Sequence, residues 1–98
     1  MTNVEYTSRI NRVIDHIEAH LDEELTLEQL ARVAHFSPYH FHRIFGALTG
    51  ETLSRFIQRL RVEKAARMLV HNSNTSITEI ALDCGFSSSS TFARAFRN

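Results

Sequence analysis

An internal repeat is the feature that most constrains what this 98-residue chain can fold into. Residues 27–37 recur fifty positions later with the same order of apolar, small and hydroxyl side chains. The repeat pairs Leu27, Leu30, Ala31, Ala34, Phe36 and Ser37 with Ile77, Ile80, Ala81, Cys84, Phe86 and Ser87. After one extra residue in a serine run, the spacing Phe-x-Arg-x-Phe that begins at Phe41 recurs at Phe92. Each copy therefore predicts a short helix, a tight turn and a second helix, which is the helix-turn-helix pattern.

Hydroxyl, proline and glycine residues mark where these helices begin and end. A hydroxyl residue followed three positions later by Glu or Gln is a capping box, and a hydroxyl residue before Pro is a second start signal. The start signals are Thr26-x-x-Gln29, Ser37-Pro38 and Ser76-x-x-Glu79. Gly50 and Gly85 are expected to end the helices that precede them, and the last helix is expected to begin within residues 87–90. On the two short helices we expect Leu27, Leu30, Ala31 and Ala34, and then Ile77, Ile80, Ala81 and Cys84, to face inward.

A long helix is predicted over residues 52–70, between the two copies. Its apolar face changes partway along. At about 100° per residue, one cluster lies on nearly the opposite side from the other. The first cluster is Leu53, Phe56, Ile57 and Leu60, and the second is Val62, Ala65, Ala66 and Leu69. A helix with this pattern is best explained as a connector whose two halves pack in different places.

The predicted fold is all-α, with two helix-turn-helix subdomains joined by a long connector helix and about seven helices in total. An amphipathic first helix carries the stripe Ile10, Val13, Ile14, Ile17 and Leu21. We predict a first subdomain over residues 1–50, a connector helix over 51–71 and a second subdomain over 72–98, truncated at its C-terminal end.

The second helix of each copy carries the candidate binding face. In the first copy, the predicted core stripe is Phe41, Ile44, Phe45 and Leu48, and the outward set is Tyr39, His42, Arg43 and Gly46. In the second copy, Phe92 and Phe96 are predicted to point inward, and Ser90, Ala93, Arg94 and Arg97 outward. The second helix of a helix-turn-helix enters the DNA major groove, where Arg suits guanine. A connector of about 18 residues would span about 27 Å, against about 34 Å between successive major grooves, so one chain could read both.

Ordinary structural roles remain open for these same residues. An exposed arginine is more often solvated or in a weak ion pair. Tyr39 could pack on the turn beside Pro38, and residues 87–90 could be plain N-cap and loop chemistry. Most connector arginines are expected on a solvated face, with one or two reaching phosphate.

The formal net charge of zero conceals an uneven distribution along the chain. Residues 1–30 hold two basic and seven acidic side chains, whereas residues 31–98 hold nine basic and four acidic ones. This asymmetry hints at a polyanionic or acidic partner for the second part, and unevenly scattered charge is the alternative.

Other functional classes find little support in the sequence. No apolar run approaches the roughly 18 residues of a membrane span, and one Cys cannot form an internal disulfide. His16 and His20 could share a metal, but no third ligand is evident and surface histidines are the better account. Cys84 aligns with Ala34, an inward position, which favours a core residue over a nucleophile. We therefore expect neither an enzyme nor a metal or cofactor site, and the alternative function is a helical protein-interaction module without DNA binding.

The chain resembles the DNA-binding domain of the AraC/XylS family of bacterial transcription regulators over residues 10–98. The resemblance rests on Leu27-Glu-Gln-Leu-Ala31, on Ser37-Pro-Tyr-His-Phe-His-Arg-Ile-Phe45, on Arg59-Leu-Arg-Val-Glu-Lys-Ala-Ala66, on Ile77-Thr-Glu-Ile-Ala81, on Cys84-Gly-Phe-Ser87 and on Phe92-Ala-Arg-Ala-Phe96. It implies a seven-helix DNA binder that usually activates transcription by recruiting RNA polymerase. It also implies a Rob-like order, with the DNA-binding domain first and a possible small-molecule effector domain after it. The expected location is the bacterial cytoplasm, at the nucleoid when bound to double-stranded DNA.

The resemblance and the helix faces together define the candidate DNA-binding residues. The base-reading candidates are Tyr39, His42, Arg43, Ser89, Ser90, Ala93 and Arg94. The phosphate-binding candidates are Ser37, His40, Arg59, Arg61, Ser88, Thr91 and Arg97.

Overall fold

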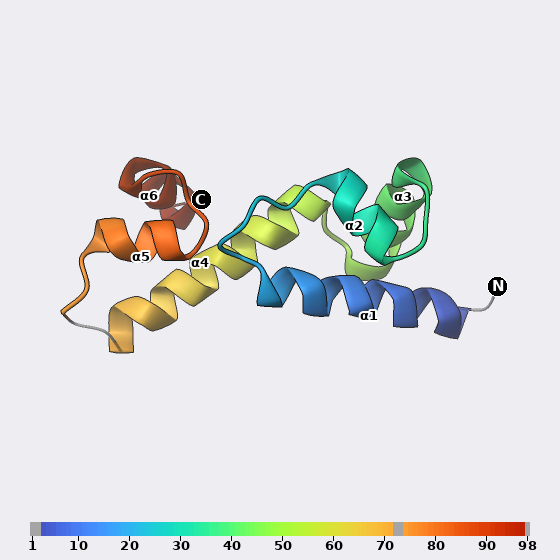
Figure 1. The fold of residues 1–98 in the computed structure, drawn as a ribbon, viewed down its shortest axis with the longest axis horizontal. Helices are drawn as coiled ribbons and strands as arrows, with labels where there is room; N and C mark the ends of the chain where they lie inside the picture. The colour runs from blue at the N-terminus through green and yellow to red at the C-terminus, as the bar shows by residue number, and fades with distance from the viewer. Residues whose placement is uncertain (1–2, 72–73, 98) are drawn as a thin grey trace. The chain divides into compact units, whose positions relative to one another are not determined.

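A computed structural model describes residues 3–71 and 74–97 of the chain, and this part is all-helical with no strand. It contains six helices: α1 (Asn3–Ala19), α2 (Leu27–Val33), α3 (Pro38–Thr49), α4 (Leu53–His71), α5 (Ile77–Asp83) and α6 (Ser89–Arg97) (Figure 1). The predicted all-α class is therefore confirmed, with six helices in the described residues where about seven were expected. None of these helices is both long and apolar enough to cross a membrane.

The chain forms two compact units. The first comprises Met1–His20 and Leu25–Phe56, and the second comprises Leu21–Glu24 and Ile57–Asn98. The first unit thus holds α1, α2, α3 and the start of α4, and the second holds the rest of α4 with α5 and α6. The finer division at residues 50 and 71 stays a prediction.

The predicted helix starts are present as hydrogen-bonded caps. The Thr26 hydroxyl accepts from the Gln29 N–H, and the Gln29 side chain accepts from the Thr26 N–H, which completes a capping box. The Ser37 hydroxyl accepts from the His40 N–H and Pro38 occupies the first turn of α3. Ser76 caps α5 by accepting from the Glu79 N–H. These caps satisfy N–H groups that have no partner within their own helix.

The two helix-turn-helix turns share one backbone arrangement. In the first, the Phe36 N–H donates to the Ala31 carbonyl at 3.0 Å; in the second, the Phe86 N–H donates to the Ala81 carbonyl at 2.9 Å. The residue before each Phe takes a positive φ, 59° at His35 and 93° at Gly85. This pattern is a Schellman motif, which ends a helix by a left-handed residue. The repeat therefore extends from side-chain type to backbone geometry.

Each unit has its own apolar core, and α4 contributes to both. Leu53 and Phe56 are buried in the first unit, where the Phe56 ring lies edge-on to Phe45 at 5.2 Å between centroids. In the second unit Ala65 is fully buried, and Val62 and Leu69 pack around it. The second core consists of Ala65, Ile80, Ala81, Cys84, Phe86 and Phe92. The predicted change of buried face along the connector helix is thus present.

Three residues predicted to face the core are exposed instead. Leu48 is 47% exposed, Ile77 56% and Phe96 54%. All three lie in the first or last turn of a helix. Helical periodicity predicts the side to which a residue points, but at a helix end the neighbouring helix does not always extend far enough to cover it.

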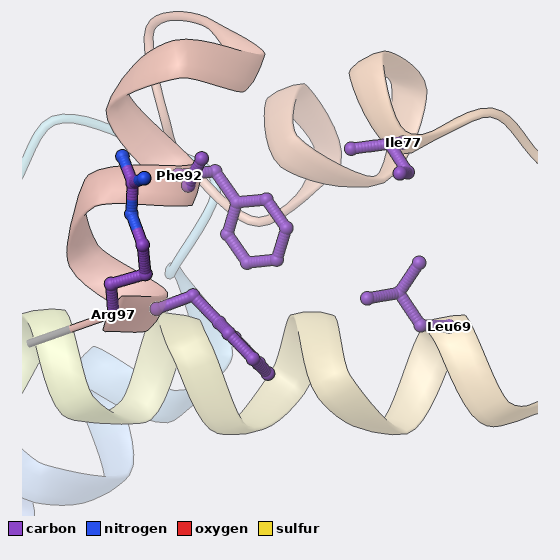
Figure 2. Close-up of a pocket in the computed structure, with 6 residues that line it drawn as sticks. Leu69, Ile77, Phe92 and Arg97 are labelled. Atoms are coloured by element: carbon purple, nitrogen blue, oxygen red, sulfur yellow. The ribbon is translucent and has the colours of Figure 1, made fainter.

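Ile77 and Phe96 border an open cavity of about 260 Å³ in the second unit (Figure 2). Leu69 and Phe92 line it from α4 and α6, and Arg97 supplies its one charged side chain. Apart from that guanidinium the described lining residues are apolar, which is not the arrangement of polar groups that orients a ligand or supports catalysis.

Candidate nucleic-acid interface

The second helix of each copy is a candidate reading helix, and the first of the two, α3, presents a polar face opposite its core face. Phe41, Ile44 and Phe45 are buried, whereas Tyr39, His42 and Arg43 are exposed. All three exposed residues are predicted base readers. The structure therefore brings them together on one accessible face near the start of the helix.

Tyr39 and Arg43 form a pair on this face. The Arg43 guanidinium carbon lies 5.9 Å from the centre of the Tyr39 ring, and Tyr39 is 73% exposed. Such exposure does not fit the alternative in which Tyr39 packs on the turn. A guanidinium over an aromatic ring is restrained by the ring while its N–H groups stay able to donate.

His40 and Ser37, two predicted phosphate contacts, also have roles within the first unit. The His40 ring lies edge-on to Phe36 at 5.4 Å and to Tyr6 at 6.1 Å between centroids. Ser37 is the N-cap that accepts from the His40 N–H at 3.2 Å. These contacts hold the first turn of α3 against α1. The phosphate contacts predicted for His40 and Ser37 stay predictions.

The second reading helix, α6, has the same organisation with shorter side chains. Phe92 is buried, while Ser90, Ala93 and Arg94 are exposed and Ser89 is half-buried. These four are the predicted base readers of the second copy. Arg97 is also exposed, one turn further along the same helix.

The hydroxyl groups before α6 form a small network. The Ser88 hydroxyl accepts from the Thr91 N–H at 3.1 Å and lies 2.9 Å from the Thr91 hydroxyl. The Ser87 hydroxyl lies 3.1 Å from the same Thr91 oxygen. Ser88 therefore has the N-cap role that the sequence left open, and the phosphate contacts of Ser88 and Thr91 stay predictions.

The two connector arginines predicted to bind phosphate differ in their surroundings. Arg59 is exposed and pairs with Glu63 at 3.0 Å, one turn along α4. Arg61 is half-buried, and it donates to the backbone carbonyls of Leu21 at 3.0 Å and Glu23 at 2.8 Å. Burial lowers the pKa of the Arg61 guanidinium, which nonetheless remains a cation. These contacts favour a structural role for Arg61.

Arg9, which the sequence did not single out, also has a defined environment. Its guanidinium lies 4.7 Å from the centre of the Phe36 ring and donates to the His35 carbonyl at 3.4 Å. The signal that could have found it is an alignment of the first predicted helix with the connector helix, because the repeat extends to those helices as well.

Charge is balanced within each unit rather than divided between them. The first unit has five basic and five acidic residues, and the second has six of each, because Asp22, Glu23 and Glu24 belong to the second unit. The reading helices are the exception: α3 and α6 contain Arg43, Arg94 and Arg97 and no acidic residue. Each of the two exposed faces thus has basic side chains that no acidic residue of the same helix offsets, which is where a polyanion would need them.

The remaining reactive side chains do not form a site. His16 and His20 stack with 4.2 Å between ring centres, and His20 Nδ1 lies 2.7 Å from the His16 carbonyl oxygen. Among the described residues no group of three or more His, Cys, Asp or Glu side chains could hold a metal ion. Cys84 is fully buried, and burial raises the pKa of its thiol, as expected for a core residue.

Known proteins are similar to this chain in sequence and in fold. A family model described as a helix-turn-helix domain matches residues 30–98. The chain is 36% identical over 88 residues to the bifunctional transcriptional activator/DNA repair enzyme AdaA of Bacillus subtilis, a match that covers 90% of this chain and 41% of AdaA. The chain spans less than half the length of the curated relatives it matches.

Two solved structures extend the comparison to three dimensions. The DNA-binding domain of AdpA, a global transcriptional factor crystallised with a target DNA, matches with a TM-score of 0.83 and 34% identity over 91% of this chain and 79% of that one. A transcriptional regulator from Chromobacterium violaceum, described as containing an AraC-type DNA-binding domain, matches with a TM-score of 0.86 and 28% identity over 98% of this chain and 85% of that one.

Proposed function

The chain belongs to the AraC/XylS family of helix-turn-helix DNA-binding domains, and from that premise we propose that it reads a specific DNA site with α3 and α6 as two recognition helices. The observation that carries the proposal is the pair of exposed faces at equivalent places in the repeat. Each face lies on the second helix of a helix-turn-helix, and each has arginine without acidic residues. DNA binding by the matched AdpA domain supports the same reading.

We further propose that the two reading helices enter successive major grooves of one asymmetric site. α4 is a continuous helix of 19 residues. At 1.5 Å per residue it is about 28 Å long, close to the roughly 34 Å that separates successive major-groove faces on one side of B-DNA. A single chain would then need no dimer to contact two half-sites.

Binding to duplex DNA at several salt concentrations tests the proposal. A preferred duplex is first selected from a random library with the wild-type chain, and its affinity is then measured by fluorescence anisotropy. We expect log Kd to rise linearly with log salt, with a slope of about 0.9 per phosphate contact. Chemical interference should map two patches about 10 base pairs apart. A flat salt response would instead favour the alternative of a protein-interaction module.

Arg43→Ala provides the sharpest single test of base reading. Arg43 is exposed on the reading face, and a bidentate contact of Arg with guanine contributes about 1–3 kcal/mol of discrimination. We expect the variant to lose that much affinity for the selected duplex and to accept other bases at one position. An equal loss on selected and random duplexes would make Arg43 a phosphate contact.

We propose a role as transcriptional activator, which is supported by the similarity to AdaA, a transcriptional activator and DNA repair enzyme. We propose that the DNA-bound chain contacts RNA polymerase, and that a small-molecule effector acts in the full protein. Transcription from a reporter promoter carrying the selected duplex upstream should rise with the wild-type chain and not with Arg43→Ala. A fall in transcription would indicate a repressor. The site of action is the bacterial cytoplasm, at the nucleoid.

A further inference from the structure

The repeat extends to the first helix of each unit, where it pairs two arginines. Shifting α1 by 52 residues places its core stripe on the second core stripe of α4, and it places Arg9 on Arg61. The matched stripes are Ile10, Val13, Ile14 and Ile17 with Val62, Ala65, Ala66 and Leu69. Arg9 and Arg61 therefore occupy equivalent positions. Each lies one residue before the first residue of the matched core stripe, which is Ile10 in α1 and Val62 in α4.

Arg9 contacts the helix-turn-helix turn of the first unit. Its guanidinium donates to the carbonyl of His35, the left-handed residue of that turn, and lies over the ring of Phe36, the next residue. An ion pair with Glu5 at 3.4 Å holds the guanidinium from the α1 side. The first reading helix begins two residues after Phe36.

Arg61 contacts the corresponding turn of the second unit. A Cβ added to Gly85, the left-handed residue there, would lie 2.6 Å from Arg61 Nε and 3.0 Å from Arg61 Cζ. The backbone of the turn thus rests directly on the guanidinium. The same hypothetical Cβ would lie 2.1 Å from the Leu21 carbonyl oxygen, to which Arg61 donates. Leu21, Arg61 and Gly85 therefore form one tightly packed cluster.

The hydrogen bonds of Arg61 explain why it is held so firmly. Its Nε and Nη2 groups donate to two carbonyls of the Leu21–Glu24 segment, which the fold assigns to the second unit. A guanidinium directs several N–H groups in a fixed fork, which one ammonium group cannot reproduce. Two of its five N–H groups are occupied in this way, and together with partial burial they hold the side chain against the turn.

We infer that Arg9 and Arg61 are equivalent positioning residues, each of which supports the turn before a reading helix and binds no DNA itself. This inference rests on the proposed DNA-reading function only for its consequence in binding. It replaces the sequence-based expectation that Arg61 is a phosphate contact. Loss of either arginine should loosen one turn and leave the other unchanged.

Amide hydrogen exchange in the free protein tests the inference without DNA. The reporters are the Phe36 and Phe86 N–H groups, whose hydrogen bonds close the two turns. We expect Arg61→Gln to accelerate exchange at Phe86 about tenfold, as for loss of roughly one net hydrogen bond, and to leave Phe36 unchanged. Arg9→Gln should produce the reverse. Arg67→Gln and Arg12→Gln, which remove exposed arginines from the same two helices, are the matched controls.

DNA binding then separates positioning from phosphate contact. On the selected duplex, Arg61→Gln should weaken affinity and flatten base preference over the same positions that Arg94→Ala affects. Its salt slope should equal that of the wild type, whereas loss of a phosphate contact would lower the slope by about 0.9. Arg61→Lys keeps the charge but not the fork, so it should retain the slope and show intermediate exchange at Phe86. That variant carries the test if Arg61→Gln fails to fold.

Two results would overturn the inference. One is unchanged exchange at Phe86 in Arg61→Gln and Arg61→Lys, and the other is a shallower salt slope in Arg61→Gln but not in Arg67→Gln. If the wild-type chain binds no duplex in a salt-dependent way, the proposed function fails. The exchange measurements would still decide whether the two arginines support the turns.

Discussion

At the scale of single residues, the two helix-turn-helix turns solve the same backbone problem with different side chains. Both need a residue in the left-handed region, where a side chain with Cβ is strained. The second turn has Gly85, whereas the first has His35 with φ of 59°. Gly85 is required for a second reason, because a Cβ at this position would lie only 2.1 Å from the Leu21 carbonyl oxygen. No such requirement is apparent in the exposed surroundings of His35.

His35→Gly should stabilise the chain. Removing the Cβ relieves left-handed strain of order 1 kcal/mol, and the extra freedom of glycine in the unfolded state offsets part of that gain. We expect urea titrations to show that the free energy of unfolding rises by about 0.5–1 kcal/mol. His35→Ala, which removes the imidazole but keeps the Cβ, is the control and should bring no gain. Equal gains in both variants would mean that the stabilisation comes from removing the imidazole ring and not from removing the Cβ.

Gly85→Ala should destabilise the chain much more than Gly50→Ala. Both glycines have positive φ, 93° and 77°, so both substitutions carry a conformational cost of about 1 kcal/mol. Only at Gly85 does the new methyl group meet backbone, whereas nothing lies within 4 Å of a Cβ at Gly50. We expect Gly85→Ala to cost about 1–3 kcal/mol more than Gly50→Ala in urea unfolding, the usual range for forced overpacking. Similar losses at both positions would mean that the turn shifts to accommodate the methyl group.

At the scale of helices, the sequence predicted the interior of each element better than its ends. The caps at Thr26, Ser37 and Ser76 could be predicted because each depends on residues within three positions. The reversal of the buried face along α4 could be predicted because helical geometry is regular. The exposure of Ile77 and Phe96 could not, because it depends on how far neighbouring helices extend.

Contacts between segments that are distant in the chain also could not be predicted from the sequence. Arg61 reaches carbonyls 38 and 40 residues away, and no local pattern distinguishes such an arginine from a solvated one. The same holds for charge, which is uneven along the chain and balanced within each unit. The exposed faces of α3 and α6, in contrast, could be predicted, because they consist of the positions opposite the buried residues of each helix.

Ser88→Ala should weaken α6 while Ser87→Ala should not. Only the Ser88 hydroxyl accepts from a backbone N–H of the helix, that of Thr91. Loss of an N-cap hydroxyl costs about 1 kcal/mol. Thermal or urea unfolding of the two variants measures the difference, since each removes one hydroxyl near Thr91. Equal losses would indicate that the hydroxyl network, rather than the cap, stabilises the start of the helix.

At the scale of the whole molecule, the fold combines two neutral units with two locally basic faces. A protein of this kind has no long-range attraction to DNA from its net charge, so its affinity depends on contacts made at the faces themselves. On the proposed function, the balance of charge therefore bears on selectivity between DNA sites. We expect this balance to limit binding to random DNA and to leave specific binding to the proposed reading helices.

The stability of the folded chain should fall at alkaline pH because of Cys84. Burial raises the pKa of its thiol in the folded state above the value of about 8.5 in an unfolded chain. The contribution of the neutral thiol is therefore complete below that unfolded value and is lost as the pH rises through the folded pKa. We expect the free energy of unfolding of the wild type to decline more steeply between pH 8 and 10 than that of Cys84→Ala. Parallel pH profiles for the two proteins would show that this thiol is not linked to folding.

The shared helix α4 also sets how the chain can change in length. Leu53 and Phe56 belong to the first core and Ala65 to the second, with no break in the helix between them. One residue inserted after Phe56 would turn every later side chain by about 100° and advance it by about 1.5 Å. The residues of the second core all follow the insertion and would turn together, whereas Arg61 would move away from the carbonyls of Leu21 and Glu23, which precede it. A single insertion or deletion in this part of α4 should therefore break the contacts that Arg61 makes with the segment before α2, whereas substitutions on the exposed side of the helix leave those contacts in place.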